Sequence, residues 1–447
     1  MTRILRLLCA LLLLPAALAA QFTPAEYAAR REAIAAKLPD GAALVIRGAP
    51  EPVHDYLEFY QSPAMLYLTG IREPNSALVL SRSGSRATAT VFVQPRDPAV
   101  EVWSGSRIGP AGATRVSGAP ARLISDLDAV VDSINRRGTR IVSDTDDTGR
   151  RLIERERGKK SPAELALIRR AVEITNEAHR EAMRAARTGM HEYELEAAIE
   201  YVFRRNGAER PAFASIIGSG PNATTLHYNA NDRQTQPGDV VVMDVGASYM
   251  GYSADVTRTI PLSGVYSPAQ REIYQIVRDA QAAAERNARP GMRSRNMLDS
   301  ARAVIAEGLT RLGLIESPTA TYDVRAPDGS LRQERQVGLF FYHGLGHGIG
   351  LEVHDPEQYY ETGVIAEGSA FTIEPGVYVR ENLLDILADT PRNRPLIAKL
   401  RPLMERYRNI GVRIEDDYIV TAQGLEWISR APREIAEIEA LMRKTIP

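Results

Sequence analysis

Short apolar runs alternate with amphipathic stretches over the first 150 residues. A short continuous apolar run is typical of a buried strand, whereas apolar positions three and four residues apart predict a helix. We predict strands at 41–46, 77–80, 89–93 and 141–143, and helices at 24–38 and 122–136. Strands that alternate with helices favour an α/β domain, which we expect to cover residues 21–155.

The pattern changes in a second predicted domain, residues 160–430. Ser161, Pro162 and Glu164 provide a hydroxyl cap, a first-turn proline and a third-position glutamate, which together predict a helix start. Long helices at 162–187, 191–206, 267–288 and 294–312 accompany strands at 212–218, 239–245, 254–260, 369–374 and 412–420. This order lacks a regular strand–helix–strand series and predicts an α+β class. The charged, helix-prone segment 382–410 is predicted as an insertion between two strands.

The first twenty residues have the order of a secretory signal. Arg3 and Arg6 precede an apolar run at 7–14, and small residues follow at 16–20. The apolar run is short for a bilayer span, although an uncleaved anchor is the alternative reading. We therefore expect residues 1–20 to be removed, the mature protein to be periplasmic or secreted, and no membrane attachment after removal.

The composition limits the kinds of binding and metal site that the chain can form. Lysine and arginine total 55 and aspartate and glutamate total 56, so the basic excess of a general nucleic-acid binder is absent. A chain of 447 residues can bury a large core without a structural metal. The single cysteine, Cys9, lies inside the predicted signal. A metal site in the mature chain must therefore use histidine, aspartate and glutamate.

Two aspartates occupy positions that call for a counter-charge. Asp244 ends the apolar run 239–244, where a lone carboxylate is costly unless it is paired or bound to metal. Asp255 follows eleven residues later. A turn at Tyr249 and Met250 would place the two carboxylates directly opposite each other, with β-carbons ~5 Å apart. A cation between them would relieve their repulsion. The alternative is one salt-bridged and one solvent-exposed aspartate.

A glycine-rich segment concentrates the imidazoles. Three of the seven histidines, His343, His347 and His354, fall within twelve residues. The interspersed glycines exclude the helical zinc-protease motif and favour a bend that directs the imidazoles into one cavity. The alternative is a buried loop with hydrogen-bonded histidines.

Two glutamates complete an oxygen-rich set of candidate ligands. Glu374 and Glu415 each lie in a strand-like apolar context, and Arg413 alternates with Glu415 and so points to the same face. Four carboxylates and one histidine suit Mn²⁺, Co²⁺, Fe²⁺ or Zn²⁺ in a dinuclear arrangement.

The order Asp, Asp, His, Glu, Glu resembles the pita-bread metallopeptidases. The segment from His343 to His347 and the segment 411–416 resemble their proline-specific branch, aminopeptidase P and prolidase. The segments 67–70 and 101–105 resemble the N-terminal domain of aminopeptidase P. The stretch 59–65 departs from that family, whose members usually have an Arg-Gln pair and an aspartate there.

The resemblance implies a fold and a set of roles. The chain would have a pita-bread metallopeptidase domain preceded by an α/β domain. Two divalent ions, with Mn²⁺ expected and Co²⁺, Zn²⁺ or Fe²⁺ as alternatives, would be held by Asp244, Asp255, His347, Glu374 and Glu415. Glu374 would also move the proton of the attacking water. The other catalytic residues would be His227 and His354 beside the scissile amide, His343 in the proline pocket, and Arg413 anchoring carboxylates.

The implied activity is that of an Xaa-Pro aminopeptidase, which removes the residue before proline from peptides. An Xaa-Pro dipeptidase is the alternative, because the insertion 382–410 could close the far side of the site or merely support a subunit contact. A metal-free pita-bread binding module is the alternative from another class. The expected partners are proline-containing peptides. We also expect copies of this chain to form a homo-oligomer, either a dimer or a tetramer.

Overall fold

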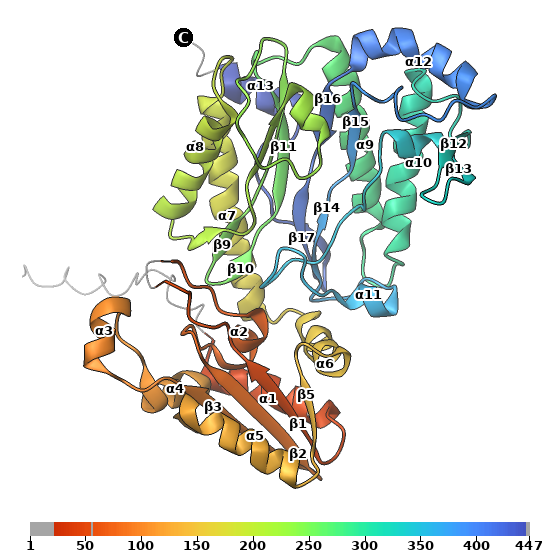
Figure 1. Ribbon diagram of the computed structural model, residues 1–447. Coiled ribbons are helices and arrows are strands. Elements are labelled where there is room, and N and C mark those ends of the chain that lie inside the picture. Colours follow the sequence, from red (N-terminus) through yellow and green to blue (C-terminus); the bar gives the residue numbers. More distant parts are fainter. Residues whose placement is uncertain (1–21, 55–56, 444–447) are drawn as a thin grey trace, which may run out of the picture.

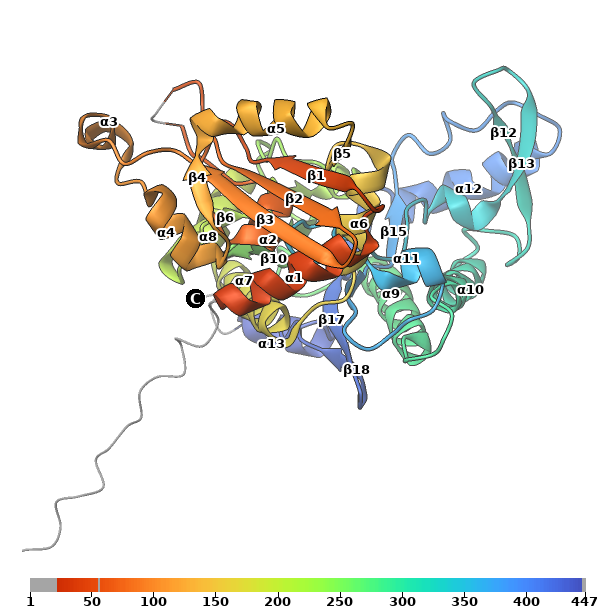
Figure 2. The same cartoon turned by 90° about the horizontal axis from the view of Figure 1, so that it is seen from below.

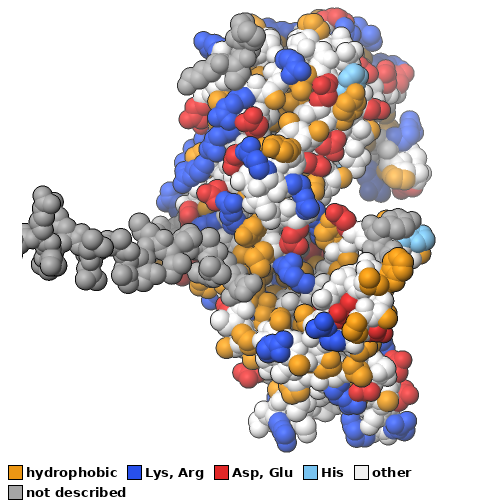
Figure 3. All heavy atoms as spheres, turned by 90° about the vertical axis from the view of Figure 1, so that its left-hand side faces the viewer, with side chains coloured by type: hydrophobic (Ala, Val, Ile, Leu, Met, Phe, Trp, Pro, Cys, Tyr) orange, Lys and Arg blue, Asp and Glu red, His pale blue; other side chains and the backbone are white. Residues whose placement is uncertain are grey.

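The computed structural model describes residues 22–54 and 57–443, and its helices and strands form two adjoining domains (Figure 1). The predicted signal, with Cys9, lies outside the described residues. None of the described helices is both long enough and apolar enough to cross a membrane. The face seen in Figure 3 is hollowed between the two domains, and acidic and basic side chains are interspersed on it.

The N-terminal domain is a five-stranded mixed sheet between helices. Its strand order is β4-β3-β2-β1-β5, with β1 parallel to β5, β3 parallel to β4, and the other pairs antiparallel. The strands are β1 (Ala42–Arg47), β2 (Ala77–Ser83), β3 (Arg86–Val93), β4 (Ala121–Leu123) and β5 (Arg140–Ser143). The helices are α1 (Pro24–Lys37), α2 (Pro63–Thr69), α3 (Pro98–Ser104), α4 (Gly109–Ser117), α5 (Leu127–Arg136) and α6 (Asp147–Arg157).

Alternate side chains of β1 explain this layering. Leu44 and Ile46 join the core that includes α1, whereas Ala43 and Val45 join the core that includes α5. Figure 2 shows α1 and α5 along the sheet from below. The predicted helix at 122–136 is wrong over its first residues, because pairing with β3 draws 121–123 into a strand. A 3-10 turn, η2 (Ile124–Asp126), then leads into α5.

The C-terminal domain surrounds its strands with two long helix pairs. These are α7 (Pro162–Ala185) with α8 (Glu192–Arg205), and α9 (Pro268–Asn287) with α10 (Arg295–Arg311), on opposite sides of the strands (Figure 1). The four predicted long helices are therefore confirmed. The start of α7 follows the predicted cap: the Ser161 N–H donates to the Glu164 carboxylate at 2.8 Å, and the Glu164 N–H donates to the Ser161 hydroxyl.

The strands of this domain form several short antiparallel sheets. They are β6 (Arg210–Pro211), β7 (Ile216–Ser219), β8 (Val240–Val245), β9 (Ala247–Tyr249), β10 (Tyr252–Ser253), β11 (Val256–Pro261), β12 (Thr321–Arg325), β13 (Leu331–Arg335), β14 (Ala370–Ile373), β15 (Gly376–Val379), β16 (Ile410–Arg413), β17 (Asp416–Thr421) and β18 (Gly424–Trp427). The remaining elements are η3 (Gly220–Thr224), η4 (Gln336–Leu339), α11 (Gln358–Thr362), α12 (Asn393–Tyr407) and α13 (Ile435–Arg443). The strand predicted at 212–218 is wrong over 212–215 and corresponds to β7 only from residue 216, and the single strand predicted at 412–420 is divided between β16 and β17.

The turn between the two candidate aspartates lies one residue later than predicted. Met250 and Gly251, with φ of 51° and 85°, form the turn, and β11 pairs with β8 so that Thr257 lies opposite Asp244. The expected direct pairing of Asp244 with Asp255 is therefore wrong. The register differs by two residues, and a shift of two preserves the face to which each side chain points.

Gly246 allows the chain to pass closely between β8 and β9. A β-carbon at this position would lie 1.7 Å from the carbonyl oxygen of Ala254. Such an approach is far inside van der Waals contact, so any larger residue must push the two segments apart. The segment after β8 is thereby held close to the segment that ends at Asp255.

We predict that Gly246→Ala destabilises the protein by about 1–3 kcal/mol, the usual cost of overpacking, and lowers Tm by about 2 to 10 °C. Gly338→Ala is the matched control, because an added β-carbon there meets no atom within 4 Å. Thermal unfolding of both variants checks this. Equal Tm changes in the two variants would contradict the close-approach argument.

Candidate metal centre

All nine residues singled out as catalytic or metal-binding line one cavity of about 520 Å³ in the C-terminal domain. They come from segments far apart in the chain: the loop after η3, β8, the start of β11, the glycine-rich loop, and the segments around β14 and β16. They are His227, Asp244, Asp255, His343, His347, His354, Glu374, Arg413 and Glu415. The sequence-based expectation of one shared site agrees with this placement, although the individual roles remain predictions.

His347 and three carboxylates border one gap. The Nε2 atom of His347 is 3.4 Å from Asp255 Oδ2, 3.7 Å from Glu415 Oε1 and 3.8 Å from Glu374 Oε1. His347, Asp255 and Glu415 each offer one possible ligand atom, and these three atoms lie within 4.8 Å of one another. Ligands at about 2.0–2.2 Å from a central ion leave separations of this order between their atoms. The gap is therefore of a size that a metal ion can fill.

The carboxylates carry more charge than their described neighbours neutralise. Asp244 and Asp255 are 7% and 5% exposed, and the Oδ1 atom of each is buried without a hydrogen-bond partner in the described part of the chain. Buried polar atoms are normally satisfied, so such orphaned oxygens require an explanation. Divalent cations match both their charge and their preference for oxygen ligands. The residues present therefore fit a metal site.

Burial also changes the proton affinity of these groups. Desolvation, followed by repulsion from Glu415, raises the pKa of Asp255 well above its ordinary range. Desolvation and Glu415 act in the same way on the pKa of Glu374. Burial, and next the charge of Asp244, raises the pKa of Glu415 to about 8. The protein without metal must therefore hold protons on this cluster at neutral pH.

His347 is held in the form that binds metal. Burial, and then the neighbouring His354, lowers its pKa to about 4, so the imidazole is neutral at pH 7. Its Nδ1–H donates to the carbonyl of Gly348 at 3.1 Å, which leaves the Nε2 lone pair facing the carboxylates.

Arg413 fixes one side of the cluster. Its Nη2 donates to Asp244 Oδ2 at 2.6 Å, and its Nη1 donates to the Tyr378 hydroxyl at 2.9 Å. Tyr378 also contacts His343 Nε2 at 2.9 Å. The guanidinium thus orients Asp244 and, through Tyr378, the imidazole of His343.

Three supporting residues were not predicted from the sequence. The Tyr378 hydroxyl joins Arg413 and His343 as described. The Thr257 hydroxyl donates to Glu415 Oε2 at 2.8 Å, and Asp417 Oδ2 accepts the backbone N–H of Asp255 at 3.0 Å. The signal for Asp417 was its place among consecutive acidic residues in an apolar strand. Thr257 carried no comparable signal, because it depends on the bridge between Thr257 and Glu415.

His227 and His354 lie at the exposed mouth of the cavity. The ring of His354 is 4.0 Å from the ring of His347, measured between centroids. Both side chains are accessible to a peptide, in contrast to the buried Asp255.

A buried ion cluster at the domain junction holds the loop that carries His354. Asp355 is 2% exposed and pairs with Arg157 at the end of α6 and with Lys160, whose Nζ is 3.0 Å from Asp355 Oδ2. The Asp355 N–H donates to the Gly348 carbonyl at 2.8 Å. Residues between the two domains therefore set the position of the glycine-rich loop.

The insertion 382–410 does not reach the cavity. It connects the paired strands β15 and β16 and contains α12, and within the described residues none of its side chains lines the site. Its contacts are on the outer side: Arg406 and Tyr407 bind Glu272 of α9, and Asn393 binds the backbone of β12. Within one chain, the segment is not placed to close the far side of the site.

Comparison with known proteins assigns both halves of the chain. Residues 166–422 match the model of Metallopeptidase family M24, and residues 27–142 match that of the Aminopeptidase P, N-terminal domain. The Xaa-Pro aminopeptidase of Haemophilus influenzae is 33% identical over 443 residues, which cover 93% of this chain and 97% of the relative. The Xaa-Pro aminopeptidase of Escherichia coli is 33% identical over 455 residues, with the same coverage.

Solved structures give the same result at the level of the fold. Zinc-substituted E. coli aminopeptidase P in complex with product aligns with a TM-score of 0.80 at 30% identity, covering 96% of this chain and 100% of that chain. Proline aminopeptidase P II from Yersinia pestis aligns with a TM-score of 0.78 at 30% identity, covering 95% of this chain and 100% of that chain. The predicted fold class is confirmed: an α+β metallopeptidase domain preceded by an α/β domain.

We predict that Mn²⁺ binding to metal-free protein at pH 7 releases at least one proton. With a pKa of about 8, the Glu415 carboxyl is mostly protonated before binding, and it must ionise to become a ligand. Apparent affinity should therefore rise as the pH increases toward 8. Calorimetric titration in buffers of different ionisation enthalpy measures the released protons. Glu415→Gln should release fewer, and a heat independent of the buffer would contradict the prediction.

Proposed function

Because this chain belongs to metallopeptidase family M24, we propose that it acts as a metal-dependent Xaa-Pro aminopeptidase. It would release the first residue from peptides whose second residue is proline. The observation that carries this proposal is the meeting of four carboxylates and His347 in one cavity, beside His343, Tyr378 and Arg413. The relatives that match over nearly the whole chain are Xaa-Pro aminopeptidases, so the dipeptidase alternative is not favoured.

Different side chains around the cavity would have different roles in peptide hydrolysis. When bound, metal ions supply Lewis acidity and make a water molecule acidic at neutral pH. Glu374 lines the cavity, and burial raises the pKa of its carboxyl, so it can take up a proton from the attacking water and return it. His354 and His227, at the mouth, can hold the scissile amide and stabilise the charge that develops on its oxygen.

Several finer properties belong to the same proposal. Four carboxylates and one histidine provide enough ligands for two ions that share carboxylates, and the oxygen-rich set suits Mn²⁺, with Co²⁺, Zn²⁺ or Fe²⁺ as alternatives. The charged, apolar and small-residue order of 1–20 supports export to the periplasm or beyond. We further propose a homo-oligomer, either a dimer or a tetramer.

A metal-free binding module would not need this arrangement. Such a protein could replace its buried carboxylates by neutral residues and avoid their mutual repulsion. Here Asp244, Asp255, Glu374 and Glu415 are all retained around His347, which supports an enzyme.

We predict that kcat/KM for a tripeptide Gly-Pro-Pro exceeds that for the dipeptide Gly-Pro by at least about tenfold in Mn²⁺. The reason is that, among the described residues, none from the insertion 382–410 lines the cavity, so this segment does not block a longer peptide. Removal of metal with a chelator should abolish both reactions. Glu415→Ala, purified in parallel, controls for contaminating peptidases. Preferential cleavage of Gly-Pro would assign a dipeptidase, and metal binding without any cleavage would support a binding module.

We predict that His354→Ala retains its metal but loses ~10² to 10⁴ in kcat, the usual scale for one acid–base or oxyanion-stabilising group. The side chain is exposed beside His347 and is not among the residues closest to the carboxylate gap. His191→Ala, at the start of α8 and outside the cavity, should keep kcat within about twofold. Elemental analysis with steady-state kinetics checks both; loss of metal would instead make His354 a ligand.

A further inference from the structure

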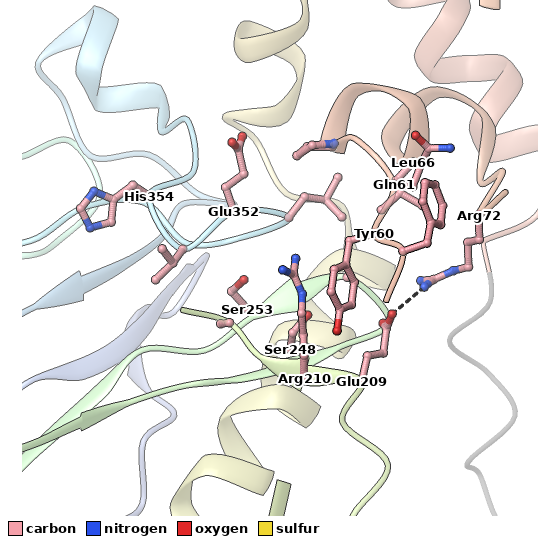
Figure 4. A pocket seen from close by; sticks show the side chains of 16 residues that line it. Tyr60, Gln61, Leu66, Arg72, Glu209, Arg210, Ser248, Ser253, Glu352 and His354 are labelled. Carbon is pink, nitrogen blue, oxygen red and sulfur yellow. Dashed lines mark hydrogen bonds and ion pairs between the residues drawn. The ribbon is translucent and has the colours of Figure 1, made fainter. Parts of the chain in front are cut away.

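A second cavity of about 400 Å³ adjoins the catalytic cavity at the domain junction (Figure 4). It lies between residues 59–72 of the N-terminal domain and the segments around β6, β9 and β10. Val353 and His354 line both cavities. A group that leaves the metal centre past His354 therefore enters this second space.

The direction of this space follows from the proposed function, on which the inference rests. His343, with Tyr378, lies on the side assigned to proline, the residue after the scissile bond. The released residue lies on the other side of the scissile bond, and we place it toward Val353 and His354, which line both cavities. Its side chain is the part of the substrate able to extend into the second cavity.

The charges that line the second cavity are unequally paired. Arg72 forms an ion pair with Glu209 at 3.0 Å, which Figure 4 shows as a dashed line. Glu352 pairs with Arg157 at 2.7 Å, outside the cavity lining, and its carboxylate points away from Arg210 (Figure 4). Arg210 has no carboxylate within 4 Å among the described residues. One positive charge therefore remains available.

Arg210 is nevertheless held in place. It belongs to β6 and lies opposite Ser248 of β9. Its guanidinium carbon is 3.9 Å from the centroid of the Tyr60 ring, and stacking of this kind leaves the N–H groups at the edge free to donate. The serine side chains of Ser248 and Ser253 lie nearby in the same cavity (Figure 4).

We propose that this cavity is the subsite for the side chain of the released residue and that Arg210 makes it favour aspartate or glutamate. A carboxylate there would gain a charge-assisted hydrogen bond from a guanidinium that is already oriented by Tyr60. The nearby carboxylate of Glu58 accepts a hydrogen bond from the Tyr60 hydroxyl and forms no ion pair with Arg210.

The test compares Glu-Pro-Pro with Gln-Pro-Pro, which have nearly the same shape and differ in charge. In the metal-loaded enzyme, kcat/KM should be higher for Glu-Pro-Pro. Arg210→Gln should lower the ratio of Glu-Pro-Pro to Gln-Pro-Pro by about 10- to 100-fold, the scale of one hydrogen bond between charged groups. Cleavage of Gln-Pro-Pro should stay within about twofold, and Arg210→Lys should keep most of the ratio.

The double variant Arg72→Gln/Glu209→Gln is the matched control, because it removes an ion pair that lines the same cavity and leaves neither charge unpaired. Its ratio should stay within about twofold of the unmodified enzyme. An equal loss in the double variant, or an unchanged ratio in Arg210→Gln, would overturn the assignment to Arg210 while leaving the peptidase activity intact. Failure of the unmodified, metal-loaded enzyme to cleave either peptide would overturn the proposed function and the subsite with it.

Discussion

Buried negative charge is the constraint on which the catalytic domain depends. Asp255, Glu415 and Asp417 are each no more than 5% exposed and lie close to one another and to Asp244. Arg413 is the cation bonded directly to this cluster among the described residues, and His347 is neutral at pH 7. Without further positive charge, these groups must keep protons. Folding buries these carboxylates at a cost in free energy, and a bound metal ion would reduce that cost by supplying positive charge.

Outside the cavity, buried arginines neutralise a further carboxylate, that of Asp416. Arg258 is fully buried and binds Asp416 at 2.6 Å, and Arg433 binds Asp416 from the other side at 2.8 Å. Arg258 also donates to the backbone carbonyl of Glu415 at 2.7 Å. The segment between β16 and β17 that carries the candidate ligand Glu415 is thus fixed by arginines that do not line the cavity. This separates the groups that hold the strand from those available to an ion.

Features with a local cause were predictable from the sequence. The cap at Ser161 and Glu164 gives the start of α7 within one residue. The sequence also predicted that Asp244, His347 and Glu415 share one site, and they line one cavity. The signals were local, because a charged residue in an apolar segment and a histidine cluster among glycines are each unusual on their own. What failed depends on partners distant in the chain: the strand at 121–123 requires β3, and the β8–β11 register requires the turn at Met250. The contacts of Tyr378 and Arg210 could not be predicted, because they form only when β15, β6 and the N-terminal domain are packed together.

The cluster of Arg157, Lys160 and Asp355 has a consequence for how this architecture can change during evolution. Arg157 ends the last helix before the catalytic domain, yet it binds the loop that carries His354. A gene that lost the first domain at this junction would leave Asp355 with half of its positive partners and the loop less firmly held. The catalytic half therefore takes from the preceding helix one of the two cations that hold this loop. A replacement cation from within the remaining chain would restore the lost pair.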